Sequence, residues 1–147
     1  MSFFDAINVA ASGLTAQRLR MDVTAENLAN AQTTRGSNGQ PYQRQEVVLQ
    51  QVGGGGFGAT LAGAVGSGSG APGGVQVAGI VADPTPDKLV YDPGHPDANA
   101  QGYVSMPNVN PVTEMVDLIS ESRSYEADVT AMQTAKQMYA KTLDLLK

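Results

Sequence analysis

The sequence contains no cysteine and no tryptophan, and only 5% of its residues are aromatic. The absence of cysteine excludes disulfide bonds, thiol catalysis and cysteine-ligated metal sites. With three phenylalanines among 147 residues, the chain can build only a thin core unless other molecules contribute apolar surface. The length fits one modest domain, or two small pieces that share a core.

Basic residues are also scarce, because nine Lys and Arg stand against 14 Asp and Glu, giving a formal net charge of -5. Since binding phosphates requires a clustered basic face, we expect no nucleic-acid partner. No apolar run approaches the roughly 20 residues that span a bilayer, so we expect no direct membrane insertion. The first residues, MSFFDAINVAASG, lack a basic stretch, and we therefore expect no cleavable secretory signal.

A long segment near the N-terminus, from about Phe3 to Thr33, has apolar residues at helical spacing. An apolar residue recurs every seven positions at Ile7, Leu14, Met21 and Leu28. This repeat predicts one long helix that pairs with another helix through a narrow seam, in which Arg18 is a weak position. The stretch TTRGSNGQP ends the helix.

The C-terminal segment has the same pattern. Asn110 followed by Pro111 predicts a helix start, with Asn as the N-cap and Pro at the first helical position. The seam residues that follow are Leu118, Tyr125, Val129, Met132, Tyr139, Leu143 and Leu146, with Lys136 as a weak point. We predict that the terminal helices, residues 1–35 and 110–147, form a coiled-coil-like pair. Narrow stripes bury little area, so this seam could close within one chain or between chains.

Residues 36–109 combine short strand-like stretches with many turns. Strands are favoured at Val47 to Leu49, at residues 75–82, and at KLVYD and QGYVSMP. A Gly-rich insert, residues 53–74, separates the first two strands. The sequence thus predicts an α+β fold, with two long terminal helices, a small β-hairpin-rich middle region and a Gly-rich loop.

Gly53, Gly55 and Gly58 formally match the dinucleotide-binding pattern G-x-G-x-x-G. Such a site also requires a helix that opens at the third glycine and an acidic residue about 20 positions later. The following segment is too rich in glycine for a stable helix, and the nearest acid is Asp83. A flexible loop is the better interpretation, and we expect no cofactor.

The only histidine, His95, has Asp92 and Asp97 beside it, and the three could form a metal site or a base with its orienting carboxylate. DPG and HPD are, however, turn sequences, because proline fixes φ and Asp can bind its own backbone. A hydrolytic site would also need a nucleophile or a third ligand on a scaffold. We therefore predict a structural turn, no metal site and no enzymatic activity.

Two segments resemble the terminal helices shared by the flagellar axial proteins, namely INVAASGLTAQRLRMDVTAENLANAQTT and NVNPVTEMVDLISESRSYEADVTAMQTAKQMYAKTL. A third, VYDPGHPDANAQGYVSMPNVN, is similar to the segment typical of FlgC-type proximal rod proteins of the bacterial flagellar basal body. The resemblance covers residues 1–50 and 75–147. The Gly-rich stretch 53–74 matches no feature of that family.

The resemblance implies a structural subunit that polymerises through its terminal helices, so that the seam residues above become subunit interfaces. It implies a rod in the periplasm, hollow for later export substrates and able to transmit torque. Implied partners are further copies, rod proteins of the FlgB, FlgF and FlgG types, the basal adaptor FliE, and the flagellar type III apparatus that exports the chain without a cleaved signal. The alternative is a coiled-coil adaptor that does not polymerise, since an adaptor needs one binding surface and a polymer needs two.

Two amides, Asn27 and Asn30, lie off the seam. At 100° per residue they stand about 100° and 160° from Leu28, on a second face with Ala16 and Val23. In an isolated hairpin this face would meet water, whereas in a tube it would meet the next subunit, where buried amides specify register. We therefore predict that both amides are subunit contacts. The alternative is that Asn30 caps the end of its own helix.

Overall fold

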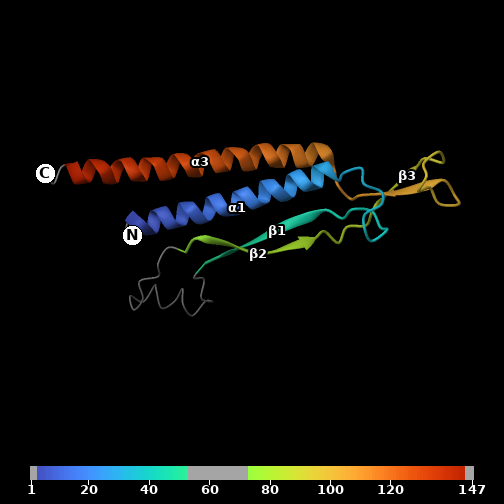
Figure 1. The fold of residues 1–147 in the computed structure, drawn as a ribbon, viewed down its shortest axis with the longest axis horizontal. Helices are drawn as coiled ribbons and strands as arrows, with labels where there is room; N and C mark the ends of the chain where they lie inside the picture. Colours follow the sequence, from blue (N-terminus) through green and yellow to red (C-terminus); the bar gives the residue numbers. More distant parts are fainter. Residues whose placement is uncertain (1–2, 53–72, 145–147) are drawn as a thin grey trace. The chain divides into compact units, whose positions relative to one another are not determined.

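The computed structural model of the chain describes residues 3–52 and 73–144. In chain order its elements are helix α1 (Phe3–Ala29), strands β1 (Gln45–Gln51), β2 (Val75–Ala82), β3 (Lys88–Tyr91) and β4 (Tyr103–Met106), and helix α3 (Pro111–Asp144) (Figure 1). Helices at both ends with small β-hairpins between them confirm the predicted α+β class. Of the predicted insert at 53–74, residues 53–72 lie outside the described part of the chain.

The chain folds as two compact units. Unit 1 contains residues 1–19, 48–79 and 121–147, and unit 2 contains residues 20–47 and 80–120. Unit 1 therefore holds the first part of α1 and most of α3. Unit 2 holds the end of α1, the start of α3 and the whole β3–β4 hairpin.

The end of α1 lies at Ala29, four residues before the predicted limit at Thr33. After it, the Thr33 N–H donates to the carbonyl of Asn30, so the chain leaves the helix through a tight turn. The Asn30 side chain donates to the carbonyl of Glu26 at 3.0 Å and accepts a bond from the Thr33 hydroxyl at 3.2 Å. Asn30 thus binds the end of its own helix, which supports the capping interpretation of this amide.

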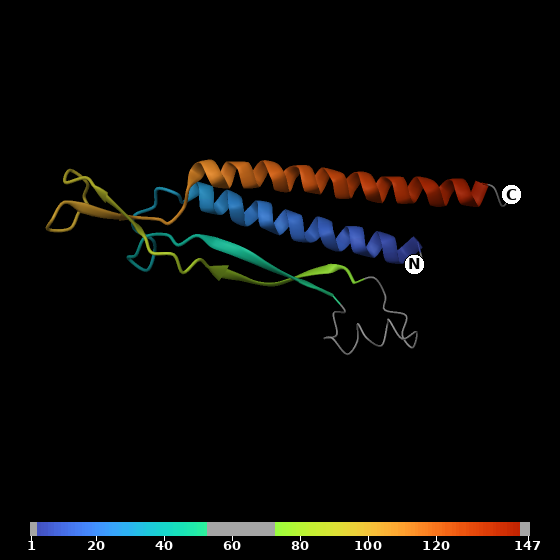
Figure 2. The same ribbon diagram turned by 180° about the vertical axis from the view of Figure 1, so that it is seen from behind.

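The start of α3 confirms the predicted cap. The Val112 N–H donates to Oδ1 of Asn110 at 3.1 Å, and the Glu114 N–H donates to the Asn110 carbonyl at 3.0 Å. Pro111 is the first helical residue, where its missing N–H costs nothing. In unit 2, the last turns of α1 lie beside these first turns of α3 (Figures 1 and 2).

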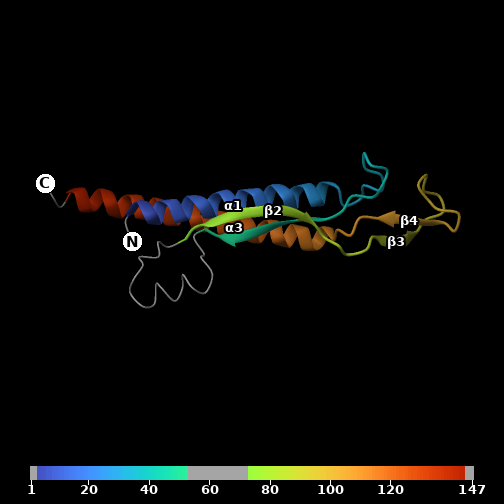
Figure 3. The same cartoon turned by 90° about the horizontal axis from the view of Figure 1, so that it is seen from below.

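The middle region contains two separate two-stranded sheets, β1–β2 and β3–β4. Strands β3 and β4 are antiparallel, with Lys88 opposite Met106 and Tyr91 opposite Tyr103 (Figure 3). Their tight pairing requires Gly102, which has a φ of +81 and lies against the Tyr91 ring.

The β1–β2 sheet is bounded by one backbone hydrogen bond at each end. In unit 2 the Asp83 N–H donates to the Arg44 carbonyl at 2.8 Å, and in unit 1 the Val52 N–H donates to the Gly74 carbonyl at 2.7 Å. Residues later in one strand thus bond residues earlier in the other, so these strands are also antiparallel.

Two close approaches position α1 within unit 1. The Ser12 hydroxyl donates to the Val9 carbonyl at 2.7 Å and accepts the Val75 N–H at 3.0 Å, which ties the start of β2 to the helix. Gly13 lies against α3, since a Cβ at this position would be 2.9 Å from Oδ2 of Asp128. Side chains larger than hydrogen would not fit this contact without movement of Asp128.

The core is thin, as the composition predicts. Among the side chains that the structure describes, the buried apolar residues are Ala16, Val23, Val104 and Val109, together with Pro107. Within residues 3–52 and 73–144, neither helix is long and apolar enough to cross a membrane.

Candidate functional site

Asn27, near the end of α1, is only 1% exposed, and its side chain makes four hydrogen bonds. Its amide nitrogen donates to the Gln45 carbonyl at 2.9 Å and to Oε2 of Glu114 at 3.2 Å. Its oxygen accepts the Gln45 N–H and the Tyr42 hydroxyl, both at 2.9 Å. A primary amide offers two N–H donors and two lone pairs, so all four positions are used. The amide binds both the N–H and the carbonyl of Gln45, as the backbone of a neighbouring strand would.

Glu114, in the first turn of α3, is a buried carboxylate whose side chain is 2% exposed. Its Oε1 accepts a bond from Nε of Arg44 at 2.6 Å, while Oε2 accepts the bond from Asn27. Arg44 also contacts the carboxylates of Glu46 and Asp83. Desolvation would lower the pKa of Arg44, but its hydrogen bonds to Glu114 and Glu46 outweigh this and raise the pKa. The guanidinium therefore stays charged, as a buried carboxylate partner requires.

Tyr42 completes the coordination of Asn27. Burial raises the pKa of the Tyr42 phenol, and the charges of Glu26 and Glu114 raise it further. The hydroxyl therefore keeps its proton and remains a donor to the Asn27 oxygen.

Asn108, just before α3, links the remaining members. Its Oδ1 accepts the Arg44 N–H at 2.8 Å, and its amide donates to the Thr85 carbonyl at 3.1 Å.

Hydrogen bonds from the hydroxyl and N–H of Thr85, together with the nearby Arg44, lower the pKa of Asp83. We call this group the polar cluster; its members are Asn27, Tyr42, Arg44, Asp83, Asn108 and Glu114, all of which lie in unit 2.

The expectation that the amide face of α1 is open in a single chain is wrong. Among residues 7–29 of this helix, the buried ones are Ala16, Val23, Thr24 and Asn27. Small side chains on this face allow neighbouring segments to approach closely, whereas the longer side chains of the heptad stripe are only half-buried. Any contact of Asn27 with another subunit would have to break bonds that it makes within its own chain.

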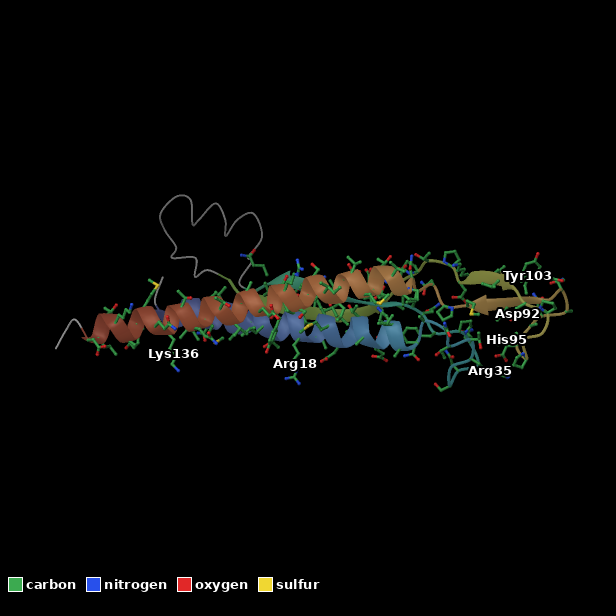
Figure 4. All side chains as sticks on the ribbon, turned by 90° about the horizontal axis from the view of Figure 1, so that it is seen from above. Arg18, Arg35, Asp92, His95, Tyr103 and Lys136 are labelled. Atoms are coloured by element: carbon green, nitrogen blue, oxygen red, sulfur yellow. The ribbon has the colours of Figure 1, made fainter. Side chains whose placement is uncertain are left out.

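The predicted seam residues are placed as follows. Ile7, Leu14, Met21, Leu28, Leu118, Tyr125, Val129 and Met132 are half-buried. Tyr139 and Leu143 are exposed, and Leu146 lies outside the described residues. Arg18 and Lys136, the weak positions, point away from their helices (Figure 4). The role of the seam residues as a subunit interface stays a prediction.

Sequence reasoning missed an exposed apolar surface on the first turns of α3. Val112, Met115, Val116 and Ile119 are between 47% and 65% exposed. Their i, i+3, i+4 and i+7 spacing places them on one side of the helix. We call these four residues the α3 stripe. The spacing was visible in the sequence, but it was hidden by the competing heptad pattern that begins at Leu118.

The β3–β4 hairpin presents a second exposed apolar group. Leu89, Tyr91 and Tyr103 are all exposed. The rings of Tyr91 and Tyr103 meet edge to face, with their centroids 5.3 Å apart. This pair lies on the hairpin face opposite Val104, which is buried.

The segment around His95 is a turn, as predicted. Asp92 accepts the N–H two residues further on at 3.2 Å, and Nδ1 of His95 accepts the Asp97 N–H at 3.1 Å. Asp97 accepts a hydrogen bond from the Thr34 hydroxyl at 2.8 Å, and its carboxylate lies 3.6 Å from Arg35 and 4.0 Å from Nδ1 of His95. In the described part of the chain, no group of three or more His, Cys, Asp or Glu side chains could hold a metal ion.

Family models match both terminal regions of the chain. The model described as "Flagella basal body rod protein" matches residues 7–35. The model described as "Flagellar basal body rod FlgEFG protein C-terminal" matches residues 100–145. These ranges contain Asn27 and the whole α3 stripe.

Curated relatives match the chain over its full length, and each is described as "Flagellar basal-body rod protein FlgC". The protein from Bacillus subtilis (strain 168) is 50% identical over 151 residues, covering 100% of both chains. That from Escherichia coli O157:H7 is 46% identical over 145 residues, covering 99% of this chain and 98% of its own. The Borreliella burgdorferi protein is 44% identical over 153 residues, covering 100% and 99%. The chain therefore belongs to the FlgC family of flagellar basal-body rod proteins.

Proposed function

We propose that the chain is a structural subunit of the rod of the bacterial flagellar basal body, which assembles with other rod components through its terminal helices. Its membership of the FlgC family supports the structural role. Within the basal body we assign it to the proximal rod, the hollow shaft that transmits torque across the periplasm and passes export substrates. The chain has no catalytic role in this proposal.

The α3 stripe is the observation that carries the proposal. Four apolar side chains on one side of a helix are exposed to water, and covering them with another apolar surface would be favourable. The spacing is the one by which a helix packs into the groove of another helix. A second helix from another subunit would cover it.

The second exposed apolar group favours polymerisation over the alternative, a coiled-coil adaptor that binds one partner helix. Leu89, Tyr91 and Tyr103 belong to the β3–β4 hairpin, whereas the α3 stripe belongs to a helix. An adaptor needs one binding surface, and a subunit inside a helical assembly needs at least two that complement each other. We propose that its neighbours are further copies, rod proteins of the FlgB, FlgF and FlgG types and the adaptor FliE, reached by type III export without a cleaved signal.

The test places a charge on the α3 stripe. In a flagellated host whose own FlgC-family gene is deleted, we expect Val116→Asp to be exported but absent from purified basal bodies, because the charge would enter a dry interface. Thr113→Asp is the matched control, since it adds the same charge at an exposed polar position of the first turn. Wild-type recovery of the Val116→Asp chain in basal bodies, with normal swimming, would refute the proposal. Capture of the chain in soluble one-to-one complexes would instead favour the adaptor.

The predicted seams are tested separately by Leu14→Asp and Met132→Asp. Each variant places a charge in a half-buried helix face, and we expect both to prevent incorporation into rods. Normal rods built from either variant would show that the heptad stripes are not interfaces.

A further inference from the structure

In the first ten residues of α3, an apolar side of the helix is exposed and a carboxylate is buried, which is the reverse of an ordinary surface helix. At 100° per residue, the members of the α3 stripe stand between about 100° and 160° from Glu114 around the helix axis. Glu114 is buried while the stripe is exposed. Leu118, about 40° from Glu114, is half-buried on the inward side. In this part of the helix a carboxylate thus points inward, and the four apolar residues of the α3 stripe point outward.

This orientation is not the one that the hydrophobic effect alone would choose. A surface helix normally turns its apolar side towards the core and its charges towards water. Rotating the first turns of α3 by about half a turn would bury the stripe and hydrate Glu114. The Asn110 cap binds the backbone N–H of Val112, so the cap does not select the rotation. Another interaction must therefore hold the stripe outward.

Glu114 supplies that interaction. Its two oxygens bind Nε of Arg44 at 2.6 Å and the amide of Asn27 at 3.2 Å. If Glu114 turned outward, the guanidinium of Arg44 and one N–H of Asn27 would stay in a largely buried site without this acceptor. Removing one partner of a buried ion pair costs far more than the pair itself contributes.

We infer that Glu114 is a positioning residue that selects the rotation of α3 and so keeps the α3 stripe available to another subunit. The contacts from which the rotation is inferred, those of Glu114 with Arg44 and Asn27, all lie within unit 2. Only the use of the stripe in assembly rests on the proposed function. The buried ion pair thus serves specificity of orientation, in the way that a single buried polar residue can set the register of a coiled coil.

The experiment uses the absence of cysteine from the natural chain. Single cysteines are introduced by Ile119→Cys on the stripe and Leu118→Cys on the inward side, and their rates of maleimide labelling are compared in the purified full-length chain. Val104→Cys, at a fully buried position, reports whether the chain is folded. In the otherwise unchanged chain we expect Ile119→Cys to label at least about threefold faster than Leu118→Cys, because thiol reactivity follows exposure.

Adding Glu114→Leu should then reverse or abolish this difference while Val104→Cys stays protected and far-UV circular dichroism stays helical. Leucine has no bond to Arg44 or Asn27 and leaves the apolar stripe free to turn inward. Glu114→Gln, which keeps the shape and one acceptor oxygen, should reduce the difference only in part. If the Glu114→Leu chain unfolds, so that Val104→Cys becomes labelled, the test uses the Glu114→Gln chain instead. The quantity compared is again the ratio of the labelling rates of Ile119→Cys and Leu118→Cys.

Equal labelling of the two cysteines in the otherwise unchanged chain would overturn the inference, because α3 would then have no fixed rotation. An unchanged ratio in the folded Glu114→Leu chain, or in Glu114→Gln where the leucine variant unfolds, would also overturn it. Labelling of the purified chain is independent of rods. A confirmed rotation with normal assembly of Val116→Asp would therefore refute the proposed use of the stripe and leave the role of Glu114 standing.

Discussion

The strongest prediction of the structure concerns Asn27→Asp, a change of almost no volume. Aspartate keeps the two acceptor bonds, to the Gln45 N–H and the Tyr42 hydroxyl, but it loses both donors. The oxygen that replaces the amide nitrogen then faces the Gln45 carbonyl and Oε2 of Glu114, where the present separations are 2.9 and 3.2 Å. Two lost hydrogen bonds cost about 1 kcal/mol each. Two carboxylates at this distance repel by roughly 4–5 kcal/mol at an effective dielectric constant near 20.

Asn27→Ala should be less harmful than the isosteric change. Alanine leaves the N–H and the carbonyl of Gln45 without their partner, at about 1–3 kcal/mol each, but it adds no charge. We therefore expect the free energy of unfolding at pH 7 to fall in the order wild type, Asn27→Ala, Asn27→Asp. A typical domain is stable by only about 5–15 kcal/mol, so the aspartate variant should be largely unfolded or strongly perturbed.

The stability of the Asn27→Asp variant should depend on pH, with a smaller loss of stability at lower pH. In the Asn27→Asp variant, the charge of Glu114 would raise the folded-state pKa of the new carboxyl group above its unfolded value near 3.9. The penalty is then full above the folded pKa and disappears as the pH falls towards the unfolded pKa. The stability gap between Asn27→Asp and Asn27→Ala should accordingly narrow between pH 7 and pH 5.

Urea unfolding followed by far-UV circular dichroism, at both pH values, measures these differences. Tyr42→Phe is the control, because it removes a single bond to Asn27 and should cost about 1 kcal/mol without the pH effect. An Asn27→Asp chain as stable as Asn27→Ala at pH 7 would refute the reasoning. It would mean that the amide faces water instead of Glu114.

Three further changes test local features by the same unfolding measurement. Gly13→Ala alone should raise the free energy of unfolding only slightly, because the new Cβ would meet Asp128. Combined with Asp128→Ala, it should raise the free energy of unfolding by about 1 kcal/mol. An increase of that size in the single variant would contradict this contact. Gly102→Ala should cost at least about 1 kcal/mol, because φ is +81 and the new Cβ would touch the Tyr91 ring; an unchanged midpoint would count against the turn geometry. Asn110→Ala should cost about 1 kcal/mol as a lost N-cap, and Asn110→Asp, which keeps the cap, should cost much less.

The features that could be predicted from the sequence are the ones encoded by neighbouring residues. Asn110 and Pro111 give the start of α3 because a cap acts on the N–H groups that follow it directly. The strands follow from short runs of β-branched residues. The end of α1 was placed too late by four residues, because the stripe predicts only where apolar residues recur. It does not predict that Asn30 and Thr33 turn the chain back.

The polar cluster could not be predicted, because its bonds join residues that are distant in the sequence. Asn27 binds Gln45 across 18 positions and Glu114 across 87. No periodicity relates these positions, and an acid in the first turn of a helix is ordinarily explained by the helix dipole alone. The amides were thus identified as unusual, but sequence reasoning did not identify the partners that they have within their own chain; their contact with another subunit stays a prediction.

The contrast between the polar cluster and the α3 stripe indicates how one chain can fix its own fold and still reserve apolar surface for assembly. Hydrogen bonds and buried ion pairs are directional, so Asn27, Arg44 and Glu114 specify one arrangement of helix ends with little apolar area. Apolar contacts are non-directional, and a stripe used inside the chain would no longer be available outside it. A subunit that buried its stripe would be the more stable monomer and the poorer building block. Replacing both partners of the ion pair, with Arg44→Met and Glu114→Leu together, should therefore have opposite effects on the two properties. Stability should be maintained or raised, because no unpaired charge stays buried, while incorporation into rods falls.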